Sequence, residues 1–284
     1  MTEQRGTPAR FRSAPQWAAV AAAVVVVVAA AVTSALVAPG GGTSAAHAAT
    51  LNVPGGQPAR PSGQADRTGV PGGSAHQPAH SAAPVPDSIQ HQPEIPGAVN
   101  ITIDDGPDPV WTPRVLQVLR KHHVHATFCM IGPQAAAHPA LVKQVVAEGH
   151  RLCDHTVHHD TTMDHKAFAY QKSEIMDALQ MIETASGGAR VYYYRAPGGA
   201  FTPASRALAA QNGMRPLGWN VDTKDFDRPG VQVIVNTVKD EIHNGPTILF
   251  HDGGGQRAQT VAALDQTLTW LKGQGFAFSF PKVG

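Results

Sequence analysis

Charge is scarce in this sequence of 284 residues. Lys, Arg, Asp and Glu together make up 15% of the chain, and the formal net charge is only +1. Because no long basic stripe is present, nucleic acid is not an expected partner, and nothing in the composition predicts a protein partner. The length suits one substantial hydrophobic core or two small ones.

Cysteine is scarcer still, with only Cys129 and Cys153 in the whole chain. Their spacing is not that of a zinc knuckle, so it predicts no cysteine-based metal site. An extracellular location would permit a disulfide between them. The alternative is that both are small buried hydrophobic side chains, and the sequence leaves these two readings open.

One long apolar run stands out against the rest of the chain. Residues 1–16 carry three arginines, and residues 17–38 are almost entirely apolar. At about 1.5 Å per residue such a run is about long enough to cross a bilayer as a helix. The positive residues before it predict a cytoplasmic N-terminal flank and export of the rest. Ala46-His47-Ala48 resembles a signal-peptidase site, so both a secreted form and a form anchored in the membrane by this segment are expected possibilities.

The next stretch, residues 39–96, is rich in Pro, Gly, Ser, Ala, Gln and His and has no long apolar run. This composition buries too little surface to offset chain entropy, so we expect a flexible linker. At Ala98 the pattern changes, and VNITIDD alternates apolar and polar residues as a strand does. We therefore expect a folded domain over residues 97–284, outside the cytoplasm.

Short apolar strands alternate with helical patterns throughout residues 97–284. This alternation predicts an α/β domain, and we expect a distorted (β/α) barrel of about seven parallel strands with outer helices. A doubly wound open sheet is the alternative. The expected elements include one continuous helix over 134–148, one strand over 214–221 and a last strand over 276–280.

Polar side chains gather at the expected carboxyl ends of five strands, which is where parallel barrels carry their active sites. His155 and His159 are four residues apart, so on a helical turn both rings would point the same way. Two imidazoles and one carboxylate form the three-ligand arrangement of catalytic zinc. Asp104 and Asp105 are adjacent, so one can bind the metal while the other acts as a general base.

Three further groups fit hydrolytic chemistry at such a centre. Arg195 supplies a fixed positive charge that could keep a catalytic carboxylate ionised and in place. Gly198 and Gly199 would let backbone N–H groups approach a developing oxyanion. His251, at another strand end, could protonate a leaving amine. His158 lies between the two histidines at the wrong helical phase and is not an expected ligand.

The segments TIDDGP, DHTVHH, RAPGG, GWNVDTKDF and LFHDGGG occur in this order. They resemble the five signature motifs of the polysaccharide deacetylase family, which has the NodB homology domain and is also called carbohydrate esterase family 4. The resemblance covers essentially all of residues 97–284. It implies a metal-dependent hydrolase that removes N-acetyl groups from an N-acetylglucosamine-containing polysaccharide, either chitin oligomers or peptidoglycan.

By position, the resemblance implies that Asp104 is the base and His251 the acid, while metal-activated water attacks the acetyl carbonyl. The metal ligands that it implies are Asp105, His155 and His159. Zinc is the expected metal, although cobalt or another divalent transition metal suits the same ligands.

The remaining implied roles concern orientation and substrate. Arg195 would orient the base, and Asp222 would tune the acid. Gly198, which stands where tyrosine is usual in the family, would donate its N–H to the oxyanion. Phe226 stands where tryptophan is common and keeps an aromatic wall.

Two positions remain open from the sequence. Trp219 is either part of the core or groove wall, or a platform on which a sugar stacks. Asp225 either supports the site from behind or lies in solvent. Two other functions also fit the sequence: an esterase that removes O-acetyl groups from xylan, and a non-catalytic glycan-binding module.

Overall fold

The computed structural model describes residues 83–284. The predicted cytoplasmic flank, the apolar segment and most of the predicted linker lie outside these residues. Within residues 83–284, no helix is both long enough and apolar enough to span a bilayer.

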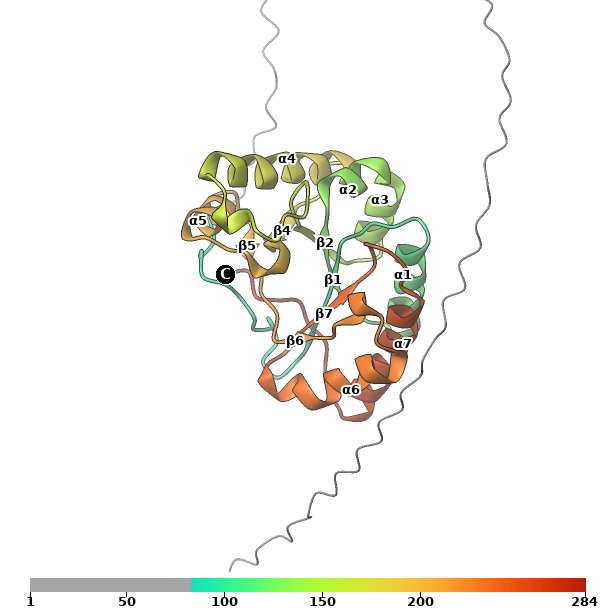
Figure 1. Ribbon diagram of the computed structural model, residues 1–284. Helices are drawn as coiled ribbons and strands as arrows, with labels where there is room; N and C mark the ends of the chain where they lie inside the picture. The colour runs from blue at the N-terminus through green and yellow to red at the C-terminus, as the bar shows by residue number, and fades with distance from the viewer. Residues whose placement is uncertain (1–82) are drawn as a thin grey trace, which may run out of the picture. The chain divides into compact units, whose positions relative to one another are not determined.

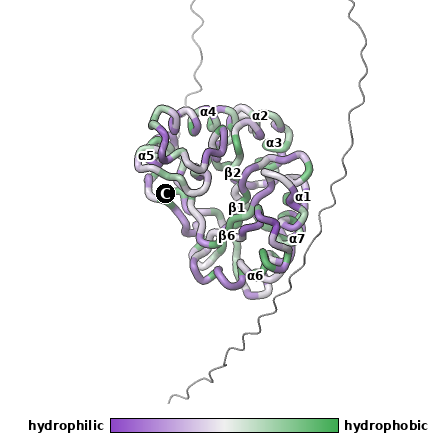
Figure 2. Tube along the Cα trace, in the orientation of Figure 1, coloured by the Kyte–Doolittle hydropathy of each residue, from purple (hydrophilic) through white to green (hydrophobic). Residues whose placement is uncertain are grey.

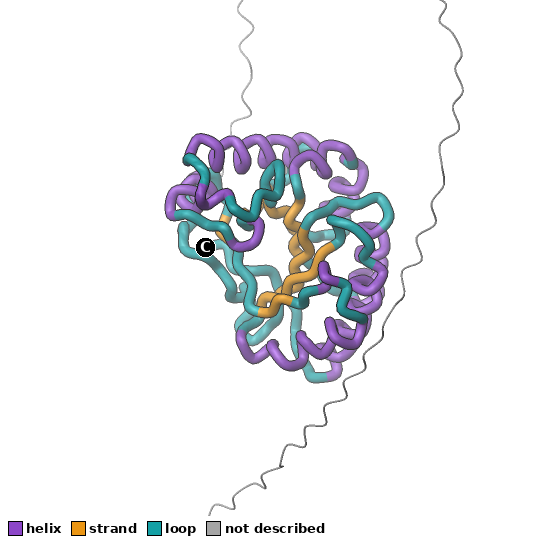
Figure 3. Tube along the Cα trace, viewed as in Figure 1, coloured by secondary structure: helices purple, strands orange, loops and turns teal. Residues whose placement is uncertain are grey.

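Seven parallel strands form one curved sheet in the order β5-β4-β3-β2-β1-β7-β6. Figure 3 shows the helices arranged around these strands, which confirms the predicted distorted barrel rather than a doubly wound sheet. The strands are β1 (Asn100–Asp104), β2 (Thr127–Met130), β3 (Arg151–Asp154), β4 (Val191–Tyr194), β5 (Arg215–Pro216), β6 (Val221–Asp222) and β7 (Thr247–His251). In the register of the sheet, Asp104 pairs with both Cys129 and His251, so these strand ends lie level with one another.

The outer layer consists of α-helices that surround the sheet (Figure 1). They are α1 (Trp111–His122), α2 (Gly132–Ala137), α3 (Pro139–Ala147), α4 (Phe168–Ser186), α5 (Pro203–Gln211), α6 (Val231–Glu241) and α7 (Ala258–Gly273). Hydrophobic and hydrophilic residues alternate along them, as Figure 2 shows. Ile175, Leu179 and Ile182 of α4 are fully buried, as their predicted common face requires. Each such side chain contributes about 1.5–3 kcal/mol by burial.

Two expected elements differ from those observed. The predicted continuous helix over 134–148 is instead two helices, α2 and α3, which meet at His138. Pro139 lacks a backbone N–H, so it begins a new helix rather than continuing the old one. The predicted last strand over 276–280 is reduced to a single bridge between Val99 and Phe278.

The predicted strand over 214–221 splits into β5 and β6, which lie at opposite edges of the sheet. Residues 217–220 therefore cross the opening of the incomplete barrel. The segment before β1 packs into this opening. Gln90 forms a β-bridge with Leu217, and the carbonyl of Gln90 accepts the N–H of Gly218 at 3.0 Å. The carbonyl of the next residue, His91, accepts a hydrogen bond from the hydroxyl of Thr247 at 2.6 Å.

The predicted domain boundary at residue 97 is consequently too late. Backbone hydrogen bonds already tie Val85 to Ala210 at 3.0 Å and Glu94 to Phe280 at 2.8 Å. Composition did not reveal this segment because many of its bonds come from its backbone, which any residue except proline can supply in full. The folded domain therefore includes the described residues that precede 97.

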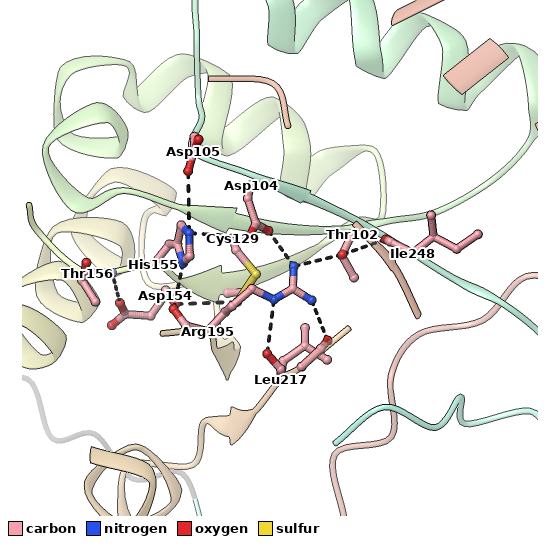
Figure 4. The surroundings of a disulfide bond; sticks show 12 residues. Thr102, Asp104, Asp105, Cys129, Asp154, His155, Thr156, Arg195, Leu217 and Ile248 are labelled. Atoms are coloured by element: carbon pink, nitrogen blue, oxygen red, sulfur yellow. Dashed lines mark hydrogen bonds and ion pairs between the residues drawn. A yellow bond between two sulfur atoms is a disulfide. The ribbon is translucent and has the colours of Figure 1, made fainter. Parts of the chain in front are cut away.

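Cys129 and Cys153 occupy paired positions on the neighbouring strands β2 and β3, and a disulfide joins them. Of the two possibilities that the sequence left open, the structure has the disulfide. The bond lies close behind the polar strand ends (Figure 4). The carbonyl of Cys129 accepts the N–H of Asp105 at 3.1 Å, so the crosslinked pair directly supports a residue of the candidate site.

Candidate active site

A cleft of about 590 Å³ opens at the carboxyl ends of the strands. It brings together nine of the ten predicted site residues, and the tenth, Arg195, is fully buried and bonded to Asp104, one of the nine. The nine that line the cleft are Asp104, Asp105, His155, His159, Gly198, Trp219, Asp222, Phe226 and His251. Residues from distant parts of the sequence therefore converge on one surface, as their positions at strand ends predict.

The chain around the two histidines takes an unusual path. The predicted helical turn is absent at His155 and His159. Both lie instead in a loop in which Thr156 has φ 68° and His159 has φ 52°. Asp105 also has a positive φ of 76°. Non-glycine residues in this region are strained, and such strain collects at functional sites, where the surrounding structure maintains it. The ring centroids of the two histidines are nevertheless only 4.9 Å apart.

Asp105, His155 and His159 present ligand atoms that lie within 4.8 Å of one another, and in residues 83–284 no other group of three or more acidic, histidine or cysteine side chains does so. Oδ1 of Asp105 lies 3.2 Å from Nε2 of His159 and 3.6 Å from Nε2 of His155. This oxygen is buried and accepts no hydrogen bond. A buried acceptor facing two imidazole nitrogens fits a bound cation, and the donor set fits zinc.

The state of His155 also suits a metal ligand. Its Nδ1 lies 2.7 Å from the carbonyl oxygen of Arg195, so Nδ1 carries the proton and the Nε2 lone pair faces Asp105. Burial lowers the pKa of His155 to about 3. The ring is therefore neutral at physiological pH, as metal ligation requires.

Asp104 is held by a buried charge partner. Nη1 of Arg195 donates to Oδ1 of Asp104 at 2.7 Å and to the hydroxyl of Thr102 at 3.0 Å (Figure 4). The other nitrogens of the guanidinium donate to the carbonyls of Leu217 and Gly218. Burial raises the pKa of Asp104, and Arg195 opposes that rise without cancelling it. A carboxylate with a raised pKa is a stronger proton acceptor, which suits a general base.

His251 is paired with Asp225, and not with Asp222 as predicted. Nδ1 of His251 lies 2.7 Å from Oδ1 of Asp225, and the backbone N–H of His251 donates to Oδ2 of the same carboxylate at 2.9 Å. Thr260 donates a further hydrogen bond to Oδ2 at 2.7 Å. Burial alone would lower the pKa of His251, but Asp225 overrides it and raises that pKa to about 9. The ring is therefore protonated at neutral pH.

Asp222 lies at the rim of the cleft and forms an ion pair with Lys224 at 2.7 Å. The backbone explains why Asp225, and not Asp222, pairs with His251. Lys224 has φ 53° and turns the chain so that Asp225 enters the interior beneath His251. Both aspartates belong to the segment DTKDF. Nothing in the local sequence reveals where that turn falls, so the sequence could not distinguish them.

The substrate side of the cleft has aromatic and glycine walls. Phe226 is 40% exposed and lies edge-on to the ring of His251, with centroids 5.3 Å apart. The ring of Trp219 is partly buried and lies 5.6 Å from Cζ of Arg195, so it is both a groove wall and a neighbour of the core. Gly198 has φ 58°, and a Cβ there would lie 3.2 Å from Cβ of Thr161. Thr161 therefore bounds the wall where the glycine leaves space.

Arg257 is a cleft residue that the sequence did not suggest. It is buried, and it donates to the carbonyls of Gly253 at 2.6 Å, Gly254 at 3.1 Å and Phe226 at 3.3 Å. These bonds tie the loop after β7 to the loop that carries Phe226. Arg257 lies outside the recognised motifs, and a single arginine near a glycine-rich loop carries no signal of such a role.

Comparison with known proteins agrees with this geometry. A family model described as polysaccharide deacetylase matches residues 91–217. A peptidoglycan-N-acetylglucosamine deacetylase of Bacillus cereus is 40% identical over 185 residues, which cover 63% of this chain and 84% of the relative. A chitooligosaccharide deacetylase of Sinorhizobium fredii is 37% identical over 191 residues, which cover 63% of this chain and 87% of the relative.

Among solved structures, the family 4 carbohydrate esterase of Streptomyces lividans in complex with acetate superimposes with a TM-score of 0.59 at 32% identity. The match covers 64% of this chain and 92% of that structure. The curved sheet of seven parallel strands with outer helices is thus shared with an enzyme of this class.

Proposed function

The chain belongs to the polysaccharide deacetylase family of hydrolases, and from this premise we propose that it removes N-acetyl groups from N-acetylglucosamine units of a glycan. The observation that carries the proposal is the arrangement around the candidate metal site. A buried carboxylate with a raised pKa, Asp104, and a protonated imidazole, His251, line the same cleft as the Asp105, His155 and His159 cluster. The relatives named as peptidoglycan and chitooligosaccharide deacetylases support this substrate class.

Zinc is the metal that we propose for the cluster, where it would polarise the acetyl carbonyl and acidify a bound water. Asp104 accepts the proton released by the attacking water, and its bond to Arg195 fixes the direction of its free oxygen. His251 then donates a proton to the departing nitrogen, and Asp225 stabilises the charged ring until that step. Without this proton the nitrogen would have to leave as an amide anion, which is a poor leaving group.

The test is acetate release by the full chain from chitin oligomers and from peptidoglycan, with and without added zinc. We expect a chelator to abolish release and zinc to restore it. Asp105→Ala and His155→Ala should reduce release to background, whereas His165→Ala, at an exposed histidine outside the cleft, should leave it unchanged. Activity that survived both ligand substitutions would refute the metal assignment.

A second candidate is an esterase acting on acetylated xylan, favoured by the likeness to the Streptomyces lividans carbohydrate esterase. The same base and acid serve both reactions because only the leaving atom differs. Parallel assays on acetylated xylan, chitin oligomers and peptidoglycan distinguish the two. Glycan binding without any acetate release would instead support a non-catalytic module.

We also propose that the domain acts outside the cytoplasm, either secreted or attached through residues 17–38. The disulfide between Cys129 and Cys153 supports this location, because such bonds persist in oxidising compartments. Fractionation of cells that produce the full chain tests the location. Recovery of the chain in the cytoplasm, with both thiols reduced, would contradict it.

A further inference from the structure

We propose that Glu174, on the outer helix α4, is a positioning residue that maintains the ligating conformation of the loop from His155 to His159. The inference rests on the proposed function, because it concerns the same metal site. Glu174 does not line the cleft, and it acts only through the loop.

The carboxylate of Glu174 contacts the two central residues of the loop, Val157 and His158. One oxygen, Oε2, accepts the backbone N–H of Val157 at 3.2 Å and that of His158 at 2.8 Å. The other oxygen, Oε1, lies 2.6 Å from Nδ1 of His158. Glu174 is only 2% exposed, so these bonds are made in a poorly hydrated environment. Hydrogen bonds to a charged, buried acceptor are stronger than those between neutral groups.

The loop needs such an anchor because its own conformation is unfavourable. Thr156 and His159 both have left-handed backbone angles, which persist only where surrounding contacts impose them. The only hydrogen bond within the loop that involves His159 is from its backbone N–H to the hydroxyl of Thr156, at 3.2 Å. The strained ends of the loop are therefore held in part through the residues between them.

The two histidine ligands differ in how they are supported. The His155 ring is buried and bonded to the carbonyl of Arg195. The His159 ring is 34% exposed, and within residues 83–284 it contacts Oδ1 of Asp105 at 3.2 Å and the ring of His155, both of them members of the metal cluster, without a hydrogen bond from outside the cluster. Its position consequently depends on the backbone of the loop, and so on Glu174. The same carboxylate turns His158 outward, where its side chain is 71% exposed, and this explains why the third histidine of the segment does not enter the metal cluster.

Isothermal titration of zinc into the metal-free full chain tests the proposal without relying on catalysis. Glu174→Ala removes every acceptor, and we expect its zinc affinity to fall about 10- to 100-fold, as for other groups that orient metal ligands. Glu174→Gln keeps a carbonyl oxygen for the two backbone N–H groups, and its amide can donate to a neutral His158. We expect this variant to retain an affinity close to that of the wild type.

Asp177→Ala is the matched control, since Asp177 lies one turn further along α4 and is exposed. Its zinc affinity should equal that of the wild type. Wild-type affinity in Glu174→Ala, or an equal loss in Glu174→Ala and Asp177→Ala, would overturn the proposal.

Amide hydrogen exchange in the metal-free wild-type chain provides a second measurement that needs no variant. The N–H groups of Val157 and His158 should be protected, although they lie in a loop. Free exchange at both would overturn the proposal even if Glu174→Ala failed to fold. A wild-type chain that bound zinc, but released no acetate from any glycan, would instead refute the proposed function and leave the role of Glu174 intact.

Discussion

Asp225→Asn should lower the pKa of His251 in the metal-free chain by at least about two units. At about 1.36 kcal/mol per unit, the protonated ring loses about 3 kcal/mol of stabilisation relative to the neutral ring. Burial lowers that pKa, but Asp225, with smaller contributions from Asp105 and Asp104, raises it from 6.5 to about 9. An asparagine keeps an oxygen that can accept a hydrogen bond but removes the charge. Burial then acts unopposed by this partner, so the pKa should fall to 6.5 or below.

The loss of activity in this variant should depend on pH. At pH 8 a ring with a pKa of about 9 is about 90% protonated, whereas one with a pKa of about 6.5 is about 3% protonated. At pH 6 both rings are mostly protonated. The ratio of wild-type to variant acetate release should therefore grow by about 20-fold or more between pH 6 and pH 8, if His251 is the acid.

The unfolding free energy provides an independent check in the metal-free chain. The pKa of His251 is higher in the folded chain than in the unfolded one, so its stabilising contribution is complete below pH 6.5 and is lost as the pH rises through about 9. The difference in unfolding free energy between wild type and Asp225→Asn should consequently shrink from pH 6.5 to pH 9. Urea titrations at several pH values measure it.

Asp222→Asn is the decisive control. Asp222 is paired with Lys224 at the rim of the cleft, so this variant should leave the pKa of His251 unchanged. The pKa is followed by NMR titration of the imidazole protons in the wild type and in both variants. A large shift in Asp222→Asn with none in Asp225→Asn would refute the pairing and restore the assignment that the motif alone suggested.

Two predictions concern stability. Replacing both Cys129 and Cys153 with alanine should lower the unfolding free energy by about 3.5 kcal/mol, the loop-closure value for their separation in the chain. Urea titration measures this loss, and a change below about 1 kcal/mol would contradict it. A chain that begins at residue 97 should unfold at a lower temperature than one that begins at residue 83, because it lacks the segment that bonds to Leu217 and Thr247. Equal melting temperatures in a thermal scan would refute this role for the segment.

The sequence predicted well those features that depend on regular spacing. Alternation of apolar residues located β1, and the apolar spacing along α4 identified its buried face. Parallel strands bring their carboxyl ends together, so the convergence of Asp104, His155 and His251 also followed from their positions in the pattern. The family resemblance then added roles that spacing alone had left open, such as which of the two adjacent aspartates is the base.

The features that the sequence missed depend on contacts between distant segments or on single backbone angles. Residues 217–220 were predicted as part of one strand because their apolar content fits a strand, but they cross between the two edges of the sheet. The exchange of roles between Asp222 and Asp225 depends on the left-handed conformation of one lysine. Glu174 and Arg257 act through bonds to backbone atoms of other loops, and no local pattern encodes those partners.

Arg195 shows why the candidate site forms as one unit. Its guanidinium orients Asp104, while its backbone carbonyl orients the ring of His155. The side chain and the main chain of one fully buried residue thereby fix the relative positions of the base and a metal ligand. The disulfide joins β3, which ends at Asp154, to β2, where the carbonyl of Cys129 accepts the N–H of Asp105. Arg195 and the disulfide therefore both stabilise this region. A rigid arrangement of this kind keeps the base at a constant distance from the site of attack, and such orientation supplies a large part of the rate in hydrolytic enzymes.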